Sequence, residues 1–130
     1  MIPYDVLDKA NIDVNHLLTY CPDGLVDKWE KAAITEVSKT GDCEDYAITK
    51  ASRLIKLFGC SPDDLRIGKF RTPKGTYHAM LIAESEYTKG FFRKTKVPCR
   101  YLLDNRWNAI YRIDQVRDKL VIEYRVEAFI

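Results

Sequence analysis

The chain has 130 residues, of which 46% are hydrophobic, which is enough for one domain with a core (residues 1–130) and too little for two. Lys and Arg number 21 and Asp and Glu number 19, so the net charge of +2 gives no reason to expect nucleic acid as a partner. No segment approaches the roughly eighteen continuous apolar residues that a membrane span needs.

Residues 1–26 are predicted to form a short N-terminal helical part, with one or two weakly patterned helices within residues 4–20. Cys-Pro-Asp-Gly at 21–24 predicts a turn, because proline presets φ and glycine tolerates positive φ. Residues 25–38 again show roughly helical spacing. The first residues carry acids and no apolar stretch, unlike a secretory signal. We therefore expect a cytoplasmic protein, or a periplasmic one if a signal has been removed.

The clearest pattern in the chain predicts a helix from about residue 43 to residue 58. Its apolar residues recur at steps of one, three and four: Ala47, Ile48, Ala51, Leu54, Ile55 and Phe58. Asp42 is a good N-cap residue, and acids in the first turn suit the helix dipole. Gly59 stands where a C-terminal glycine ends many helices.

After this helix the apolar period changes to two, which predicts β-strands. The predicted strands are residues 65–70, 76–83, 100–105 and 119–129. Alternation in the last of them suggests one buried and one wetter face. The polar, basic residues 84–99 are predicted to be a solvated loop that connects two strands as a hairpin. Helices followed by antiparallel strands indicate the α+β class, with the long helix packed on the sheet.

Cys43 is a candidate nucleophile because it begins the long helix on the side of its apolar stripe. Unpaired N–H groups and a partial positive charge at a helix N-terminus favour thiolate over thiol, and the same groups can hold an oxyanion. Neighbouring acids oppose a thiolate. Adjacent side chains on a helix diverge by about 100°, so we expect Asp42 and Glu44 to face away from the sulfur. There they would cap N–H groups or bind a cation.

A nucleophilic cysteine needs a base and a group that orients the base. Of the two histidines, His16 is expected on the surface, whereas His78 lies in a strand among apolar neighbours and must find a partner. That partner could be a backbone carbonyl, in which case His78 would have a structural role and no catalytic one. Asp104 ends the next strand, where an Asp-Asn pair is also common in turns. The chain order Cys, His, Asp is that of a known nucleophilic arrangement.

The four cysteines are Cys21, Cys43, Cys60 and Cys99, and no two form a CxxC pair, so a zinc site is not expected. Free thiols in a reducing compartment are the default expectation. The sequence is also compatible with a Cys21–Cys99 or a Cys60–Cys99 disulfide.

Three blocks of the sequence, "GDCEDYAITKASRLIKLFG", "YHAMLIA" and "YLLDNRWNAIYRI", resemble the bacterial transglutaminase-like cysteine peptidases of the LapG type. The similarity covers roughly residues 27–126. The resemblance implies a papain-like, transglutaminase-like fold and a triad. In that triad Cys43 is the nucleophile, His78 is the base and later the acid, and Asp104 orients the imidazole.

The resemblance also implies Ca²⁺, which Asp42, Glu44 and Asp45 would help to ligate, since hard carboxylate oxygens suit this ion. It implies a protein substrate, because LapG-type enzymes cleave a large surface adhesin. The chain departs from the pattern in showing no signal, in its short region before Cys43, and in the basic loop 86–99. These departures suggest a compact relative encoded by a phage or mobile element.

Three functions are compatible with these residues. A cysteine endopeptidase would form an acyl-enzyme and hydrolyse it with water. A transglutaminase or amidase would use the same triad and pass the acyl group to an amine. A papain-like binding module would keep the site without turnover.

Overall fold

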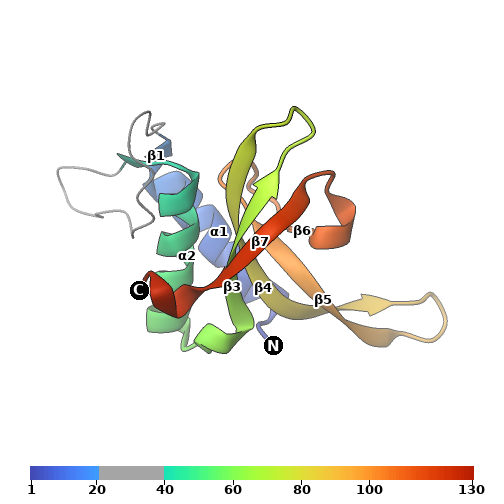
Figure 1. Ribbon diagram of the computed structural model, residues 1–130. Coiled ribbons are helices and arrows are strands. Elements are labelled where there is room, and N and C mark those ends of the chain that lie inside the picture. The colour runs from blue at the N-terminus through green and yellow to red at the C-terminus, as the bar shows by residue number, and fades with distance from the viewer. Residues whose placement is uncertain (21–39) are drawn as a thin grey trace.

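The computed structural model describes residues 1–20 and 40–130 (Figure 1). Within these residues, two helices lie side by side on one face of an antiparallel sheet (Figure 1). The helices are α1 (Tyr4–Leu17) and α2 (Cys43–Phe58). The strands follow the order β6-β5-β4-β3-β7. This arrangement confirms the predicted α+β class.

The strands of the sheet are β3 (Leu65–Arg71), β4 (Tyr77–Lys89), β5 (Thr95–Leu103), β6 (Tyr111–Arg112) and β7 (Lys119–Arg125). A separate parallel pair joins β1 (Thr19–Tyr20) to β2 (Thr40–Gly41), which comes just before α2 in the chain. Single 3₁₀ turns are η1 (Pro62–Asp64), η2 (Ile113–Gln115) and η3 (Val126–Ala128).

Helix α2 has the bounds that the sequence predicts, and local chemistry explains both ends. Asp42 is the N-cap, and it forms a capping box with Asp45. Gly59 ends the helix in the left-handed region, with φ 68°, which a residue with a Cβ rarely adopts. The predicted helices before residue 20 prove to be one helix, α1.

Apolar residues fill both faces of the sheet. The face under α1 and α2 holds the larger cluster, built from helix residues such as Leu7, Ile48 and Leu54 and strand residues such as Ile67 and Leu81. The opposite face holds a smaller cluster: Phe70, Met80, Ile82 and Leu102, with Ile113, Val116 and Leu120 packed against it. The centre of the sheet is therefore buried on both sides, which holds the ends of β4 and β5 in place.

Residues 84–99 connect two strands as a hairpin, as predicted, but the prediction that they form a loop throughout is wrong. β4 and β5 continue through this segment as a paired hairpin, with Glu84 opposite Arg100 and Lys89 opposite Thr95. The hairpin extends beyond the body of the protein, so much of both its faces meets solvent and the sequence lacks a buried, alternating side (Figure 1). Gly90, with φ 108°, lies in the turn at its tip.

The predicted burial of the last strand is also largely wrong. β7 is an edge strand that pairs only with β3 in the described sheet, and Ile122 and Tyr124 on its supposed inner face are 45% and 37% exposed. Leu120 is partly buried at one end, and Val126, just past the strand, is fully buried. Alternation identified the strand here, but it did not identify what covers each face.

Some predictions concern residues 21–39, which lie outside the described residues: the turn at 21–24, the helical spacing of 25–38 and any bond of Cys21. Cys43, Cys60 and Cys99 are free thiols, so no Cys60–Cys99 disulfide forms. Among the described helices, none is long and apolar enough to cross a membrane.

Candidate active site

Cys43 begins α2 and points toward the start of β4, where the backbone N–H of Ala79 hydrogen-bonds to its sulfur. The thiol in turn lies 3.3 Å from Oε2 of Glu44, to which it donates. Glu44 therefore faces the sulfur, contrary to the expectation that it turns away. Burial, together with the negative charge of Glu44, raises the pKa of Cys43 to about 12. The hydrogen bond from Ala79 lowers this pKa, but by less than burial raises it. The resting site thus holds a thiol, although the sequence predicted a thiolate.

Asp42 and Asp45 hydrogen-bond to the backbone at the start of α2, which is the capping role considered for Asp42 in the sequence. Oδ1 of Asp42 accepts the N–H of Asp45 at 3.2 Å, and Oδ2 of Asp45 accepts the N–H of Asp42 at 3.1 Å. Asp42 is only 7% exposed. The two aspartates therefore use two of the N–H groups at the start of α2, which leaves fewer of them for an oxyanion.

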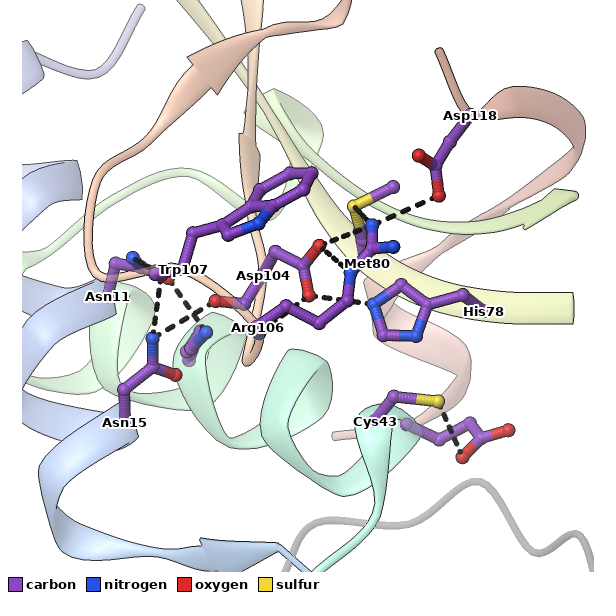
Figure 2. Close-up of polar contacts among 11 residues, drawn as sticks. Asn11, Asn15, Cys43, His78, Met80, Asp104, Arg106, Trp107 and Asp118 are labelled. Atoms are coloured by element: carbon purple, nitrogen blue, oxygen red, sulfur yellow. Dashed lines mark hydrogen bonds and ion pairs between the residues drawn. The ribbon is translucent and has the colours of Figure 1, made fainter. Parts of the chain in front are cut away.

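His78, near the start of β4, lies next to Asp104, just past the end of β5. The Nε2 atom of His78 is 2.7 Å from Oδ1 of Asp104, and the two side chains are 11% and 0% exposed. Nε2 faces Asp104, and the other ring nitrogen, Nδ1, faces Cys43 (Figure 2). Asp104, rather than a backbone carbonyl, is thus the partner that buried His78 required. His16, in contrast, is exposed.

The Asp104 carboxylate also holds Arg106, which the sequence analysis did not single out. The Nε of Arg106 donates to Oδ2 at 2.7 Å, and its backbone N–H donates to Oδ1 at 3.0 Å. Burial raises the pKa of Asp104, but the hydrogen bonds and charge of His78 and the bonds from Arg106 outweigh it, so the net shift is downward. Asp104 therefore remains a carboxylate able to orient an imidazole. The Arg106 guanidinium also donates to Oδ2 of Asp118 at 3.0 Å.

A buried polar network fixes the backbone around Asp104. Nδ2 of Asn15 donates to the carbonyl oxygen of Asp104 at 3.0 Å and to that of Trp107 at 2.9 Å. Nδ2 of Asn11 donates to the same Trp107 oxygen at 2.9 Å, and its Oδ1 accepts Nζ of Lys50 at 2.7 Å (Figure 2). Helix α1 thus contacts the loop that carries Asp104 directly, and α2 is linked to it through Lys50 and Asn11.

Lys50 is unusual because it is fully buried, with 0% exposure, and sits one helix turn after Tyr46 in the middle of α2. Burial lowers its pKa to about 7, an effect that the charge of Asp104 partly offsets. Sequence reasoning missed Lys50, Asn11 and Asn15. The spacing of Asn11 and Asn15 by four residues places both on one helix face, but nothing in the sequence indicates that this face meets residues 104–108.

The acids around Cys43 do not converge as a metal site in this structure. Over residues 1–20 and 42–130, no group of three or more His, Cys, Asp and Glu side chains is arranged to hold a metal ion. Asp42 and Asp45 engage the helix backbone, and Glu44 contacts the thiol. Their oxygen chemistry nevertheless fits Ca²⁺, which takes six to eight hard oxygen ligands at a site.

The fold is similar to solved structures of a known protein, LapG. LapG from Legionella pneumophila is 25% identical, with a TM-score of 0.70, over 92% of this chain and 64% of that chain. Calcium-bound LapG has a TM-score of 0.71 and EGTA-treated LapG one of 0.70, each at 25% identity. These matches cover 92% of this chain and 64% and 62% of the LapG chains, so this chain spans less than two thirds of their length.

No curated protein sequence matches the chain significantly. A family profile described as "bacterial transglutaminase-like cysteine proteinase BTLCP" matches residues 3–117. That span takes in α1, α2 and the sheet as far as the loop before β7. The chain therefore belongs to the bacterial transglutaminase-like cysteine proteinase family.

Proposed function

We propose that the chain is a cysteine endopeptidase in which Cys43, His78 and Asp104 form the catalytic triad. The observation that carries this proposal is the His78 ring, which has Asp104 on Nε2 at 2.7 Å and presents Nδ1 to Cys43 (Figure 2). A carboxylate on Nε2 favours the tautomer that keeps its proton there. Nδ1 is then the basic nitrogen, which is the requirement for taking a proton from the thiol.

In the reaction, Nδ1 of His78 accepts the proton of Cys43, and the thiolate sulfur attacks the carbonyl carbon of the scissile peptide bond. The C–N bond breaks as the imidazolium returns that proton to the leaving amine. A water molecule, deprotonated by His78, then hydrolyses the thioester. Asp104 stabilises the imidazolium during both halves of the cycle, which its buried, ionised state permits.

The high pKa of Cys43 gives this mechanism a specific requirement. A thiol with a pKa of about 12 is almost fully protonated at neutral pH, so proton transfer to His78 has to accompany substrate binding or the removal of negative charge. The Glu44 carboxylate, 3.3 Å from the sulfur, is the charge that opposes ionisation at closest range.

We also propose that Ca²⁺ binds beside the nucleophile through Asp42, Glu44 and Asp45. The support is their hard oxygen chemistry and the existence of a calcium-bound relative. When bound, the ion would supply positive charge that offsets these carboxylates. Thermal unfolding in Ca²⁺, Mg²⁺ and EGTA tests the binding without an activity assay. We expect Ca²⁺ alone to raise the Tm, and Glu44→Gln to reduce that rise; equal Tm values in Ca²⁺ and EGTA would contradict the site.

The peptidase itself is tested with fluorescently labelled casein and a mixed peptide library, each incubated with the wild type and with Cys43→Ala. We expect cleavage by the wild type and none by the variant. Cys60→Ala is the matched control, because Cys60 is a half-buried free thiol outside the site and its loss should leave cleavage unchanged. Cleavage that survives Cys43→Ala would overturn the proposal. Incorporation of a labelled amine in place of hydrolysis would identify acyl transfer instead.

A further inference from the structure

Three adjoining hollows surround the turn between β3 and β4 and begin at His78. The first has a volume of about 500 Å³ and is lined by His78 together with Lys74 and Arg106. The second, of about 460 Å³, is lined by Arg71, Thr72, Pro73, Arg117 and Lys119. The third, of about 440 Å³, lies between Trp107 and the loop before β7. Pro73 lines all three, so they adjoin one another at the β3–β4 turn, and together they are here called the hairpin cleft, after the β3–β4 hairpin.

The hairpin cleft is strongly basic, although the chain as a whole is close to neutral. Its five cations are Arg71, Lys74, Arg106, Arg117 and Lys119. Among the described residues that line it, the only acid is Asp118, whose side chain is 5% exposed and already paired with Arg106. The other four cations form no ion pair within the described residues. They therefore present uncompensated positive charge to whatever occupies the cleft.

Negatively charged side chains lie on the other side of the Cys43 and His78 pair from the hairpin cleft. Asp42, Glu44 and Asp45 lie at the start of α2 beside Cys43. Arg106 and Asp118 lie on the side of the His78 ring away from Cys43 (Figure 2). A substrate chain that crosses between these two sides meets acids on one and cations on the other. An acidic segment is attracted toward the hairpin cleft, so the cations there set its direction.

We propose that the hairpin cleft binds an acidic segment of the protein substrate, rich in Asp and Glu, on one side of the scissile bond. This inference rests on the proposed peptidase function for the identity of the bond, but not for the binding itself. Arginine pairs with carboxylates through two parallel N–H donors, and lysine does so as a point charge. The cleft opens at His78, where the proposed chemistry needs a peptide carbonyl. A nucleic acid could use the same cations, but it would place no peptide carbonyl beside His78.

Binding is measured first, with the Cys43→Ala variant and short fluorescein-labelled peptides, by fluorescence anisotropy. One peptide is rich in Asp and Glu, and its partner carries Asn and Gln at the same positions. We expect the acidic peptide to bind more tightly and to weaken as NaCl is raised. When Arg117→Gln and Lys119→Gln are introduced into the Cys43→Ala variant, the affinity for the acidic peptide should fall about 5- to 10-fold. That is the effect of losing two partly screened ion pairs.

The matched control is the pair Arg93→Gln and Lys94→Gln, which removes the same charge from the exposed tip of the β4–β5 hairpin, at the other end of β4 from His78. It should leave the affinity unchanged. An equal loss in the control pair, or equal affinities for the acidic and amide peptides, would overturn the inference. Binding of a single-stranded oligonucleotide in preference to the acidic peptide would also overturn it.

Cleavage then distinguishes this inference from the proposed function. Wild-type cleavage of a peptide library should enrich Asp and Glu on one side of the scissile bond only. Cleavage that depends on Cys43 and shows no such enrichment would refute the acidic preference and leave the peptidase standing. Selective binding of the acidic peptide without any cleavage would refute the peptidase and leave the cleft assignment standing.

Discussion

Carboxylates lie on two sides of the candidate nucleophile, and they are held in different ways. Asp42 and Asp45 hydrogen-bond to each other's backbone within one helical turn. Asp104 is held through partners distant in sequence: His78 contacts its side chain and Asn15 contacts its backbone. The first arrangement is local and depends only on α2 forming. The second exists only when α1, β4 and β5 are all in place, so its geometry reports on the whole fold.

The comparison is tested most strongly by Asp104→Asn, for which we expect the largest effect. The amide would keep the shape, but it would lose the charge that stabilises the imidazolium and could present an N–H to Nε2. Activity should fall by roughly 10³- to 10⁴-fold, as expected when a triad carboxylate is lost. Cleavage of the labelled peptide library measures kcat/KM directly.

Asp118→Asn is the matched control for Asp104→Asn. Asp118 binds the same guanidinium, that of Arg106, at 3.0 Å, but no contact joins it to His78 in the described structure. Its loss should change kcat/KM by less than about tenfold, because an ion pair that is open to solvent contributes at most about 1 kcal/mol. Similar losses in both variants would show that Asp104 acts through Arg106 rather than through His78.

The second prediction concerns Lys50, which belongs to the non-local region. Its pKa of about 7 lies below the ordinary value of 10.5, so the unfolded chain binds more protons than the folded one between these pH values. The fold favours neutral Lys50, so the contribution of this group to the free energy of unfolding is fully present above about pH 10.5 and is lost as the pH falls toward 7. The free energy of unfolding should rise with pH across this window, by up to roughly 1.4 kcal/mol per pH unit.

Lys50→Met removes that proton-binding difference while keeping a long side chain. We expect the free energy of unfolding of the variant, from denaturant titrations at several pH values between 7 and 9, to rise less steeply with pH than that of the wild type. Lys56→Met is the control, because Lys56 is exposed on the same helix. If the wild type and Lys50→Met give parallel pH profiles, Lys50 does not titrate anomalously.

The same contrast explains which parts of the structure the sequence predicts. Helix α2, its Asp42 cap and its Gly59 end follow from local rules, and the structure has all three. Cys43, His78 and Asp104 could be chosen because few residue types perform this chemistry and because the family pattern is specific. Lys50 could not, since a lysine inside an apolar helix pattern looks like any exposed residue until α1 covers it with Asn11.

Glu44 shows a limit even within the local region. Helical geometry places neighbouring side chains at about 100°, which suggested that Glu44 would turn from the sulfur. A glutamate side chain is long enough to bend back, and the thiol donates to its Oε2 at 3.3 Å. The direction of a Cβ can be inferred from the sequence, whereas the position of a flexible side chain's end depends on which partners surround it.

The smallest expected effect concerns Asp42, which belongs to the locally held pair of carboxylates at the start of α2. Asp42→Ala removes the N-cap acceptor of the Asp45 N–H and should lower the free energy of unfolding by about 1 kcal/mol in EGTA. Ser61→Ala, which removes an exposed cap from the three-residue turn η1, should cost less because that turn orders few residues. Repeating the denaturant titration in Ca²⁺ separates the two roles of Asp42. A capping role alone predicts the same loss in both buffers, whereas a calcium ligand predicts a larger loss in Ca²⁺, since the ion stabilises only the folded state that binds it.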